Sequence, residues 1–220
     1  MIKKVKIEEL YKRIPEHVKP LFEGKIYPWE ILPDIKSFAA FIAENGLEGY
    51  TRLSEGIWVG KNVKIAQSAV IEAPMIIGHG SEIRAGAFIR GSVIIGDGCV
   101  IGNSTELKNC ILMDEVQVPH YNYIGDSILG YKAHTGAGTV CSNLKADHGN
   151  VVIHGDKEYE TGLRKVGAFL GDFADVGCNS VLNPGTVVGM NTNVYPLTAA
   201  RGVYPESCIV KKADLVVKMI

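Results

Sequence analysis

Three charged side chains recur at intervals of eighteen residues: Glu72, Arg90 and Lys108 each follow an aliphatic residue directly. If eighteen residues make one turn of a coil, these side chains stack at about the inter-strand spacing of ~4.8 Å. Stacked cations repel each other, and a phosphate would relieve this because Arg binds it bidentately and Lys adds a point charge. The alternative is that Glu72 neutralises Arg90 while Lys108 points into water. The spacing alone leaves both readings open.

Two further segments carry candidate chemistry. His120 and Tyr123 lie in PHYNYIGD, and histidine is the side chain best suited to proton transfer near neutral pH. A lone exposed histidine is more often inert, so the residue type by itself is weak support. The segment GAGTVCSN (136–143) would let an extended ligand lie close to the backbone, or its glycines only turn corners.

A six-residue step predicts the elements that carry these side chains. Ten positions at this interval are aliphatic: Val59, Ile65, Ile71, Ile77, Ile83, Ile89, Ile95, Ile101, Leu107 and Met113. A period of six fits neither an α-helix nor an alternating strand, so it indicates a repeat architecture. Three hexads would close one triangular coil with the aliphatic side chains inside, and coils must stack to bury that core. We therefore expect an all-β fold, a parallel β-helix of hexapeptide repeats.

The repeat is interrupted twice, and interruptions of a regular scaffold are where function tends to sit. The period fails at Pro119, where an aliphatic residue is expected, so His120 is expected to leave the coil there. A second break, at about 142–165, predicts a projecting loop or arm. The expected domains are a helical lead-in that caps the open end of the coil, the coil with an inserted loop, and a tail: 1–55, 56–200 with the loop at about 144–165, and 201–220.

Within the lead-in, one helix can be placed more closely. Asp34 is a candidate cap, the apolar face consists of Ile35, Phe38, Ala39 and Ile42, and Asn45-Gly46 is a stop signal.

Composition narrows the class of protein. The chain has 220 residues and a net charge of −1, so nothing favours a nucleic-acid or membrane-surface partner. The first residues lack the apolar run of a signal peptide, and no apolar stretch is long enough for a membrane span. Five cysteines without a CxxC pair predict reduced, buried thiols in a cytoplasmic protein.

The stretch ELKNCILMDEVQVPHYNYIGDSILGYKAHTGAGTVCSNL resembles glucosamine-1-phosphate N-acetyltransferase, the acetyltransferase half of the bifunctional enzyme that makes UDP-N-acetylglucosamine. The resemblance covers about residues 56–205, and its P-H-x-x-Y-I-G-D and G-A-G-T motifs are specific. It implies a left-handed coil, a homotrimer with active sites between neighbouring coils, acetyl-CoA as co-substrate, no metal, and an amino-sugar phosphate as acceptor.

The resemblance also implies residue roles. His120 matches the general base that takes a proton from the sugar amine, while Arg90 and Lys108 match basic residues that bind the sugar phosphate. The remaining implied contacts are Tyr123, Asn143 and Lys165 with the sugar, His134 in place of a sugar-contacting Asn, and Ala137, Cys178 (in place of a Ser), Gly189 and Arg201 with the coenzyme. Acyl transfer would then be direct, through a tetrahedral oxyanion held by a backbone N–H and without a covalent enzyme intermediate.

Departures from the family leave other functions open. No Gly-rich nucleotide loop occurs in residues 1–50, so we expect no uridyltransferase domain, and the arm is longer than in the family. One rival is a metal enzyme of the γ-carbonic anhydrase kind, but His79 is followed five residues later by Arg84 where that family needs a second histidine. The other rival is a non-catalytic protein that binds sugar phosphates.

Overall fold

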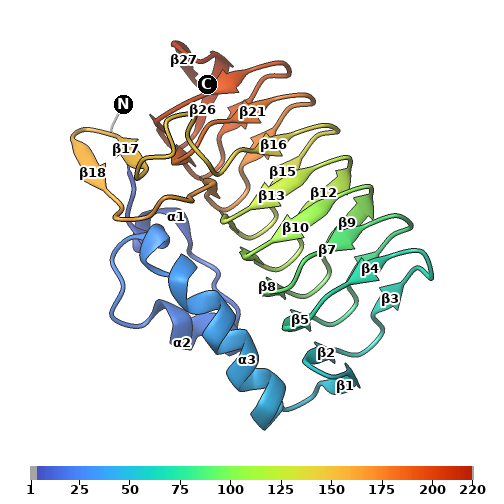
Figure 1. The fold of residues 1–220 in the computed structure, drawn as a ribbon. Coiled ribbons are helices and arrows are strands. Elements are labelled where there is room, and N and C mark those ends of the chain that lie inside the picture. The colour runs from blue at the N-terminus through green and yellow to red at the C-terminus, as the bar shows by residue number, and fades with distance from the viewer. Residues whose placement is uncertain (1–3, 220) are drawn as a thin grey trace.

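A computed structural model describes residues 4–219, so the first three residues of the expected lead-in and the last residue of the expected tail lie outside it. Short parallel strands wind into a stacked coil with three flat sheets, and helices lie along one side (Figure 1). Antiparallel strands occur only at the two ends of the coil and in an inserted hairpin. The expected parallel β-helix of hexapeptide repeats with a small helical region is therefore confirmed.

The three sheets run the length of the coil. Sheet A consists, in spatial order, of β1 (Thr51–Ser54), β2 (Ile57–Val59), β5 (Met75–Ile77), β8 (Val93–Ile95), β11 (Cys110–Leu112), β14 (Ile128–Leu129), β19 (Ala168–Leu170), β22 (Thr186–Val188) and β25 (Val203–Tyr204). Sheet B consists of β3 (Lys64–Ile65), β6 (Glu82–Ile83), β9 (Val100–Asn103), β12 (Gln117–His120), β15 (His134–Thr135), β20 (Asp175–Val176), β23 (Asn193–Val194), β26 (Cys208–Lys212) and β27 (Leu215–Lys218). Sheet C consists of β4 (Val70–Ile71), β7 (Phe88–Ile89), β10 (Glu106–Lys108), β13 (Tyr123–Gly125), β16 (Val140–Cys141), β21 (Val181–Leu182) and β24 (Ala199–Ala200).

The six-residue step between inward residues holds as far as Leu107. The step then shortens to five residues, earlier in the chain than the sequence pattern indicated. The next inward residue is Leu112, five positions on, which pairs with Ile95, whereas Met113 packs in the cluster outside the coil. Val118 pairs with Ile101 and fills the following inward position, so Pro119 never occupies one. The expected failure of the period at Pro119 is therefore wrong.

The physical cause is a shortened corner. Leu107 pairs with Ile124, which makes this coil seventeen residues long, and the residue is lost at the corner between sheets C and A. There Asn109 takes a left-handed backbone with φ 47°, as does Asp126 in the next coil. Asn and Asp tolerate this conformation better than most residues. The irregularity thus lies beside Lys108, at the opposite edge of sheet C from His120.

The lead-in contains the elements α1 (Ile7–Leu10), η1 (Glu16–Val18), α2 (Lys19–Phe22), η2 (Pro28–Glu30), η3 (Leu32–Asp34) and α3 (Ile35–Asn45). The expected helix is confirmed as α3, which ends at Gly46 with φ 84°. Asp34 makes no capping bond with its side chain and instead pairs with Lys25 at 2.8 Å.

The sequence suggested that the lead-in closes the open end of the coil, but it lies elsewhere. Its apolar side chains pack sideways onto the outward face of sheet A, so that sheet is buried on both faces (Figure 1). The lead-in and the arm share one apolar cluster with the outward residues of sheet A, which are Ile76, Ile94, Ile111, Ile128, Phe169, Val187 and Val203. A sheet face of large apolar residues must be covered, and the lead-in and the arm supply that cover.

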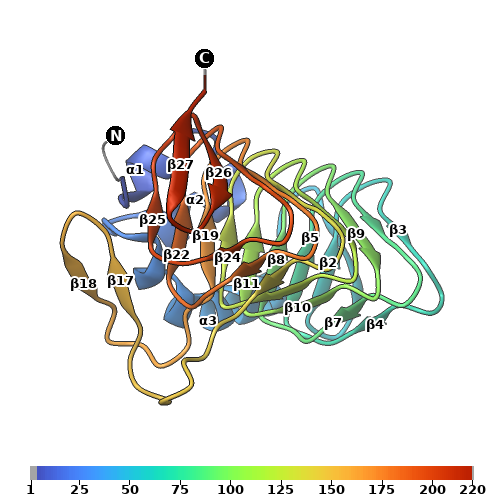
Figure 2. The same ribbon diagram turned by 90° about the horizontal axis from the view of Figure 1, so that it is seen from above.

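The second interruption forms a hairpin of β17 (Val152–His154) and β18 (Glu158–Glu160), which stands out from the coil (Figure 2). Ile153 is buried beneath it, and the ring of Tyr159 packs edge-on to Trp29 of the lead-in, 5.9 Å between centroids. The arm and the lead-in therefore brace each other.

The cysteines follow the prediction in part. Four are buried free thiols, but Cys178 is exposed because it lies at a turn between sheets B and C. Burial raises the pKa of the Cys141 thiol to about 12.

Candidate active site

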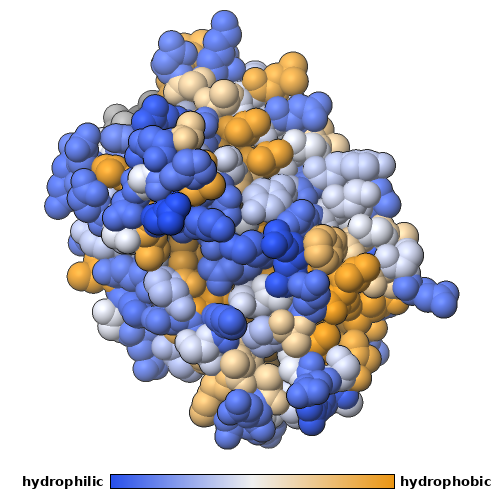
Figure 3. All heavy atoms as spheres, in the orientation of Figure 1, coloured by the Kyte–Doolittle hydropathy of each residue, from blue (hydrophilic) through white to orange (hydrophobic). Residues whose placement is uncertain are grey.

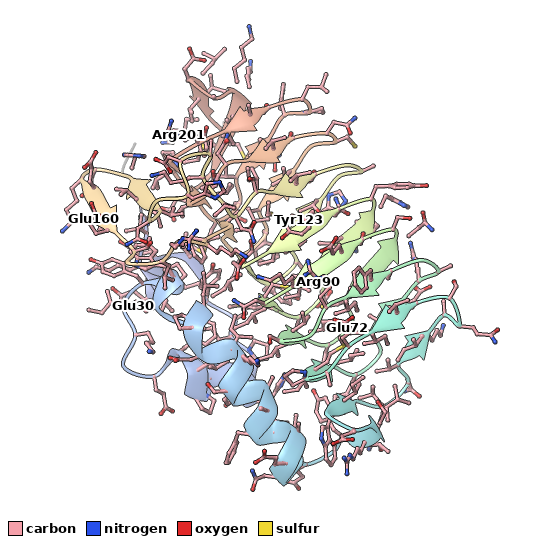
Figure 4. All side chains as sticks on the ribbon, viewed as in Figure 1. Glu30, Glu72, Arg90, Tyr123, Glu160 and Arg201 are labelled. Carbon is pink, nitrogen blue, oxygen red and sulfur yellow. The ribbon has the colours of Figure 1, made fainter. Side chains whose placement is uncertain are left out.

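The column of charged residues lies along one edge of sheet C, at the position that follows each inward residue. The ladder registers extend it over seven coils, as Glu72, Arg90, Lys108, Gly125, Ser142, Asn183 and Arg201. We name these seven residues the edge column. Figure 4 shows Glu72, Arg90, Tyr123 and Arg201 following one another along the coil.

The structure contradicts the alternative reading, in which Glu72 neutralises Arg90 and Lys108 points into water. Arg90 donates from Nη1 to Glu106 at 2.9 Å rather than pairing with Glu72. Lys108 does not simply point into water, because its Nζ lies 3.2 Å from Asp126. The first pair is solvent-exposed, and water screens the attraction between such charges. Arg90 can therefore exchange Glu106 for an incoming anion at little cost.

Gly125 interrupts the edge column and leaves room for two polar groups. A Cβ at this position would lie 2.5 Å from the Tyr123 hydroxyl and 2.9 Å from the Asn143 amide nitrogen. That amide donates to the Tyr123 oxygen at 3.2 Å, which leaves the phenolic proton free to donate to a ligand. Burial, together with the nearby charge of Asp126, raises the pKa of Tyr123, so the hydroxyl stays protonated at neutral pH.

Asp126 is the centre of the polar network behind Gly125. Its buried carboxylate accepts hydrogen bonds from Asn109 at 2.9 Å and from Asn143, in addition to the pair with Lys108. Asn109 also donates to the carbonyl of Leu32 at 3.3 Å, which ties the lead-in to the network. These bonds hold the ammonium of Lys108 and the amide of Asn143 in fixed positions.

A pocket of about 560 Å³ opens beside this network. It is lined by Leu32 and Pro33 of the lead-in, Asn109 and Asp126 of the coil, and Leu144, Leu163, Arg164 and Lys165 of the arm. Lys165 is exposed in it and is held there by a backbone bridge to Leu144. The structure therefore brings Arg90, Lys108, Tyr123, Asn143 and Lys165 together at one edge of sheet C.

His120 lies at the other edge of sheet C. It ends β12 on sheet B, its side chain is exposed, and Tyr121 then turns the corner with φ 51°. Within residues 4–219 its ring has no hydrogen-bond partner. The next coil stacks on this corner, because the Gly138 N–H donates to the His120 carbonyl at 3.0 Å.

The expected coenzyme contacts divide between corners. Ala137 and Cys178 lie in stacked turns between sheets B and C, since the Asn179 N–H donates to the Ala137 carbonyl at 2.8 Å. Gly189 does not join them: it follows β22 at the corner between sheets A and B, where the Glu206 backbone stacks on it. Pro196, not Gly189, lies against Gly177, so Gly189 is separated from the turns of Ala137 and Cys178 within one chain.

Arg201 is likewise remote from Ala137, because it belongs to the edge column. Its Nη2 lies 3.5 Å from Nε2 of His154, in a polar pocket of about 680 Å³ formed between the coil and the arm. Lys145, Asn183 and Glu158 also line this pocket.

His134 has a partner that the sequence pattern did not reveal. Its Nδ1 lies 2.8 Å from a carboxylate oxygen of Asp175, which pairs with it on the neighbouring strand. The two residues are 41 positions apart because the arm is inserted between them. Glu106, Asn109 and Asp126 were also missed. Asp126 follows Lys108 at the eighteen-residue interval, which was a usable signal.

Two groups thus flank sheet C within one chain. His120, Ala137 and Cys178 lie at the edge shared with sheet B, with His134 three residues before Ala137 on sheet B, and the anion-binding candidates lie at the edge shared with sheet A. Across residues 4–219, no three His, Cys, Asp or Glu side chains converge as a metal-ligand set. In the same range no helix has both the length and the apolar character needed to cross a membrane.

The sequence comparisons agree with this fold. A family described as "EIF2B subunit epsilon LbH domain" matches residues 54–157. The bifunctional protein GlmU of Methanococcus aeolicus is 29% identical over 191 residues, covering 78% of this chain and 46% of that protein. The bifunctional sugar-1-phosphate nucleotidylyltransferase/acetyltransferase of Sulfurisphaera tokodaii is 36% identical over 97 residues, covering 44% of this chain and 24% of that protein.

Among solved structures, the UDP-N-acetylglucosamine acyltransferase of Campylobacter jejuni superposes with a TM-score of 0.46 at 17% identity, covering 71% of this chain and 67% of that one. The chain spans less than half the length of the curated relatives named above. The sequence matches confirm the expected resemblance: the chain is a left-handed β-helix of hexapeptide repeats, similar to the bifunctional GlmU proteins and to a bifunctional sugar-1-phosphate nucleotidylyltransferase/acetyltransferase.

Proposed function

We propose that the chain is an acetyl-CoA-dependent N-acetyltransferase that acts on an amino-sugar phosphate such as glucosamine-1-phosphate. The observation that carries this proposal is the edge column, where Arg90 and Lys108 stack beside the Gly125 gap and the Tyr123 hydroxyl. The chain's similarity to sugar-1-phosphate acetyltransferase relatives supports the same substrate class.

The phosphate would bind between Arg90 and Lys108. Arg90 gives up only an exposed pair with Glu106, and its guanidinium can then hold two phosphate oxygens. Lys108 keeps its buried partner Asp126, which fixes the ammonium without blocking its outward side. When Glu106 is displaced, the positive charge of Arg90 loses its partner, and the bound phosphate neutralises it.

The sugar would lie over Gly125. Tyr123 donates its phenolic proton and Asn143 accepts through its amide oxygen, a pattern that suits hydroxyl groups, which both donate and accept. Lys165 adds a further donor from the arm side of the adjoining pocket. A site built on paired hydrogen bonds discriminates strongly against ligands that leave its polar groups unpaired.

His120 would act as general base. As the acceptor nitrogen attacks the thioester carbonyl, the C–N bond forms and the nitrogen loses a proton to the imidazole. The tetrahedral oxyanion then collapses, the C–S bond breaks, and the thiolate of the coenzyme leaves with a proton returned by the imidazolium. Acetyl-CoA would approach along the turns of Ala137 and Cys178, where Gly136 packs directly against the exposed Cys178.

The two groups of residues lie at opposite edges of sheet C, so we propose that a site is completed between chains of a homotrimer. Sheet C carries an outward column that includes the exposed apolar residues Val70, Phe88 and Val181. Figure 3 shows an apolar patch on the side where β4 and β7 run, beside hydrophilic residues. Covering such a surface with a second copy would bring the His120 edge of one chain toward the Arg90 edge of the next.

The test is free-thiol release from acetyl-CoA across a panel of amino-sugar phosphates and simple amines. We expect turnover to be fastest on an amino-sugar 1-phosphate and His120→Ala to lower kcat by about a hundredfold or more. No turnover on any amine would contradict the acetyltransferase proposal. Phosphate-dependent binding without turnover would favour a non-catalytic binding protein.

A further inference from the structure

His134 and Asp175 face each other on neighbouring strands of sheet B. The residues pair in register between β15 and β20, and Nδ1 of His134 lies 2.8 Å from Oδ1 of Asp175. Both side chains are substantially exposed, His134 by 40% and Asp175 by 55%, so a ligand can reach them. This pair contributes nothing visible to the core of the coil.

The contact fixes the chemistry of the imidazole. A carboxylate can only accept, so Nδ1 carries the proton and Nε2 presents its lone pair outward. In the same column the neighbours on either side, Gln117 below His134 and Asn193 above Asp175, are uncharged. Asp175 is thus the charged group that faces this ring among the strands packed against it. The ring of His120, in contrast, has no orienting partner within residues 4–219.

The pair lies next to the turns expected to meet the coenzyme. His134 precedes Ala137 by three residues, and Asp175 precedes Cys178 by three, on two coils that stack directly. The Gly136 backbone lies against Cys178, so these two turns form one continuous surface. An acyl group delivered along that surface would be close to the strand that carries His134.

We propose that His134, positioned by Asp175, is a second general base of the acyl transfer. This rests on the proposed function. Nε2 takes one proton from the bound ammonium group and passes it to solvent, which leaves a neutral amine. His120 then takes the second proton as the C–N bond forms and returns it to the departing thiolate as the C–S bond breaks. Asp175 is a positioning residue that stabilises the imidazolium and keeps the productive tautomer. His134 would then transfer a proton as well as contact the sugar, which an Asn at this position could not do.

The experiment measures steady-state thiol release at several pH values for the wild type, His134→Asn and Asp175→Asn, each on the best acceptor found for the wild type. We expect both variants to lower kcat about tenfold with little change in KM. Removing the carboxylate disfavours the charged imidazolium, so Asp175→Asn should also move the acid limb of the kcat profile to lower pH. The double variant His120→Ala/His134→Asn should lose the activity that remains in His120→Ala alone.

His148→Asn is the matched control, because it removes an exposed histidine from the arm at a left-handed position, φ 57°, that Asn also tolerates. It should keep kcat within about twofold of the wild type. Thermal unfolding checks that each variant folds, and His134→Gln replaces His134→Asn if that one does not.

A wild type that turns over while His134→Asn and Asp175→Asn leave kcat and the acid limb unchanged would overturn this proposal alone. A wild type inactive on every amine would overturn it together with the proposed function.

Discussion

Gly125 interrupts the line of side chains between Lys108 and Ser142, and the polar groups of Tyr123 and Asn143 occupy the space it leaves. Its φ is not in the left-handed region, so alanine is allowed by the backbone. The requirement for glycine therefore comes from the approach of neighbouring side chains, which belongs to the site rather than to the turn.

We predict that Gly125→Ala raises KM for the sugar acceptor about tenfold or more while the free energy of unfolding changes by about 1 kcal/mol or less. The added methyl group displaces the Tyr123 hydroxyl, which it would approach to 2.5 Å, and so breaks its bond with Asn143. Steady-state kinetics and urea unfolding measure the two quantities. Gly149→Ala, with no contact to its Cβ shorter than 3.4 Å, is the control. An unchanged KM would mean that the sugar does not bind over Gly125.

At the scale of elements, the lead-in meets the coil through a buried histidine. The ring of His17 packs 5.7 Å from Tyr50, which in turn packs 4.7 Å from His79. Nε2 of His17 is buried without a hydrogen-bond partner among the described residues. Burial lowers the pKa of His17 from its ordinary value of 6.5, with His79 acting in the same direction and Asp97 opposing it.

This lowered pKa predicts acid sensitivity of the lead-in contact. Between the lowered folded value and the ordinary 6.5, the unfolded chain binds more protons than the folded one. The free energy of unfolding therefore rises with pH through this window. This contribution is fully present above the window and is lost as the pH falls through it. We predict that His17→Phe removes this dependence and adds about 1 kcal/mol by eliminating an unpartnered nitrogen.

Urea unfolding of the wild type and His17→Phe from about pH 7 to about pH 5 measures the difference. The exposed His148→Asn should retain the wild-type slope. Parallel pH profiles for wild type and His17→Phe would contradict the prediction.

The strands could be predicted from the sequence wherever the six-residue step of inward residues was uninterrupted. From Ile65 to Leu107 the inward residues follow a strict step because each must fill the same interior, and that part of the fold is predicted correctly. The shortened corner at Asn109 shifts the register, and a fixed step cannot anticipate this since the turn conformation decides it.

The same limit applies to the site. The column of Arg90 and Lys108 follows from spacing, whereas their acidic partners do not, because side-chain conformation selects Glu106 and Asp126. Asp175 was missed since the arm separates it from His134 by more than two coils of sequence. Cover of sheet A by the lead-in was also not predictable, because the outward isoleucines there look like extra core residues.

At the scale of the whole molecule, the proposed trimer requires the outward face of sheet C to be buried between subunits. Val181 is 37% exposed on the outward column of that sheet, on the strand that leads to Asn183 of the edge column. We predict that Val181→Glu dissociates the assembly to a 23.8 kDa chain and abolishes turnover, because each interface would bury an unpaired carboxylate.

Sedimentation of the wild type should give three times the mass of one chain. Leu53→Glu, on exposed β1 of sheet A, is the control and should leave mass and activity unchanged. A monomeric, fully active wild type would contradict the assembly proposal.

The lead-in lies along sheet A and contacts the coil near both ends, where Trp58 donates to the Ala43 carbonyl and Lys4 pairs with Glu206. Stacked repeats by themselves are coupled only to their nearest neighbours, so a solenoid can fray one turn at a time. A strap across many turns changes this, because no single turn can open without disrupting packing that the distant turns share. The lead-in, which carries none of the proposed catalytic residues, thus makes the coil unfold as one cooperative unit. This keeps the two edges of sheet C in fixed positions relative to each other.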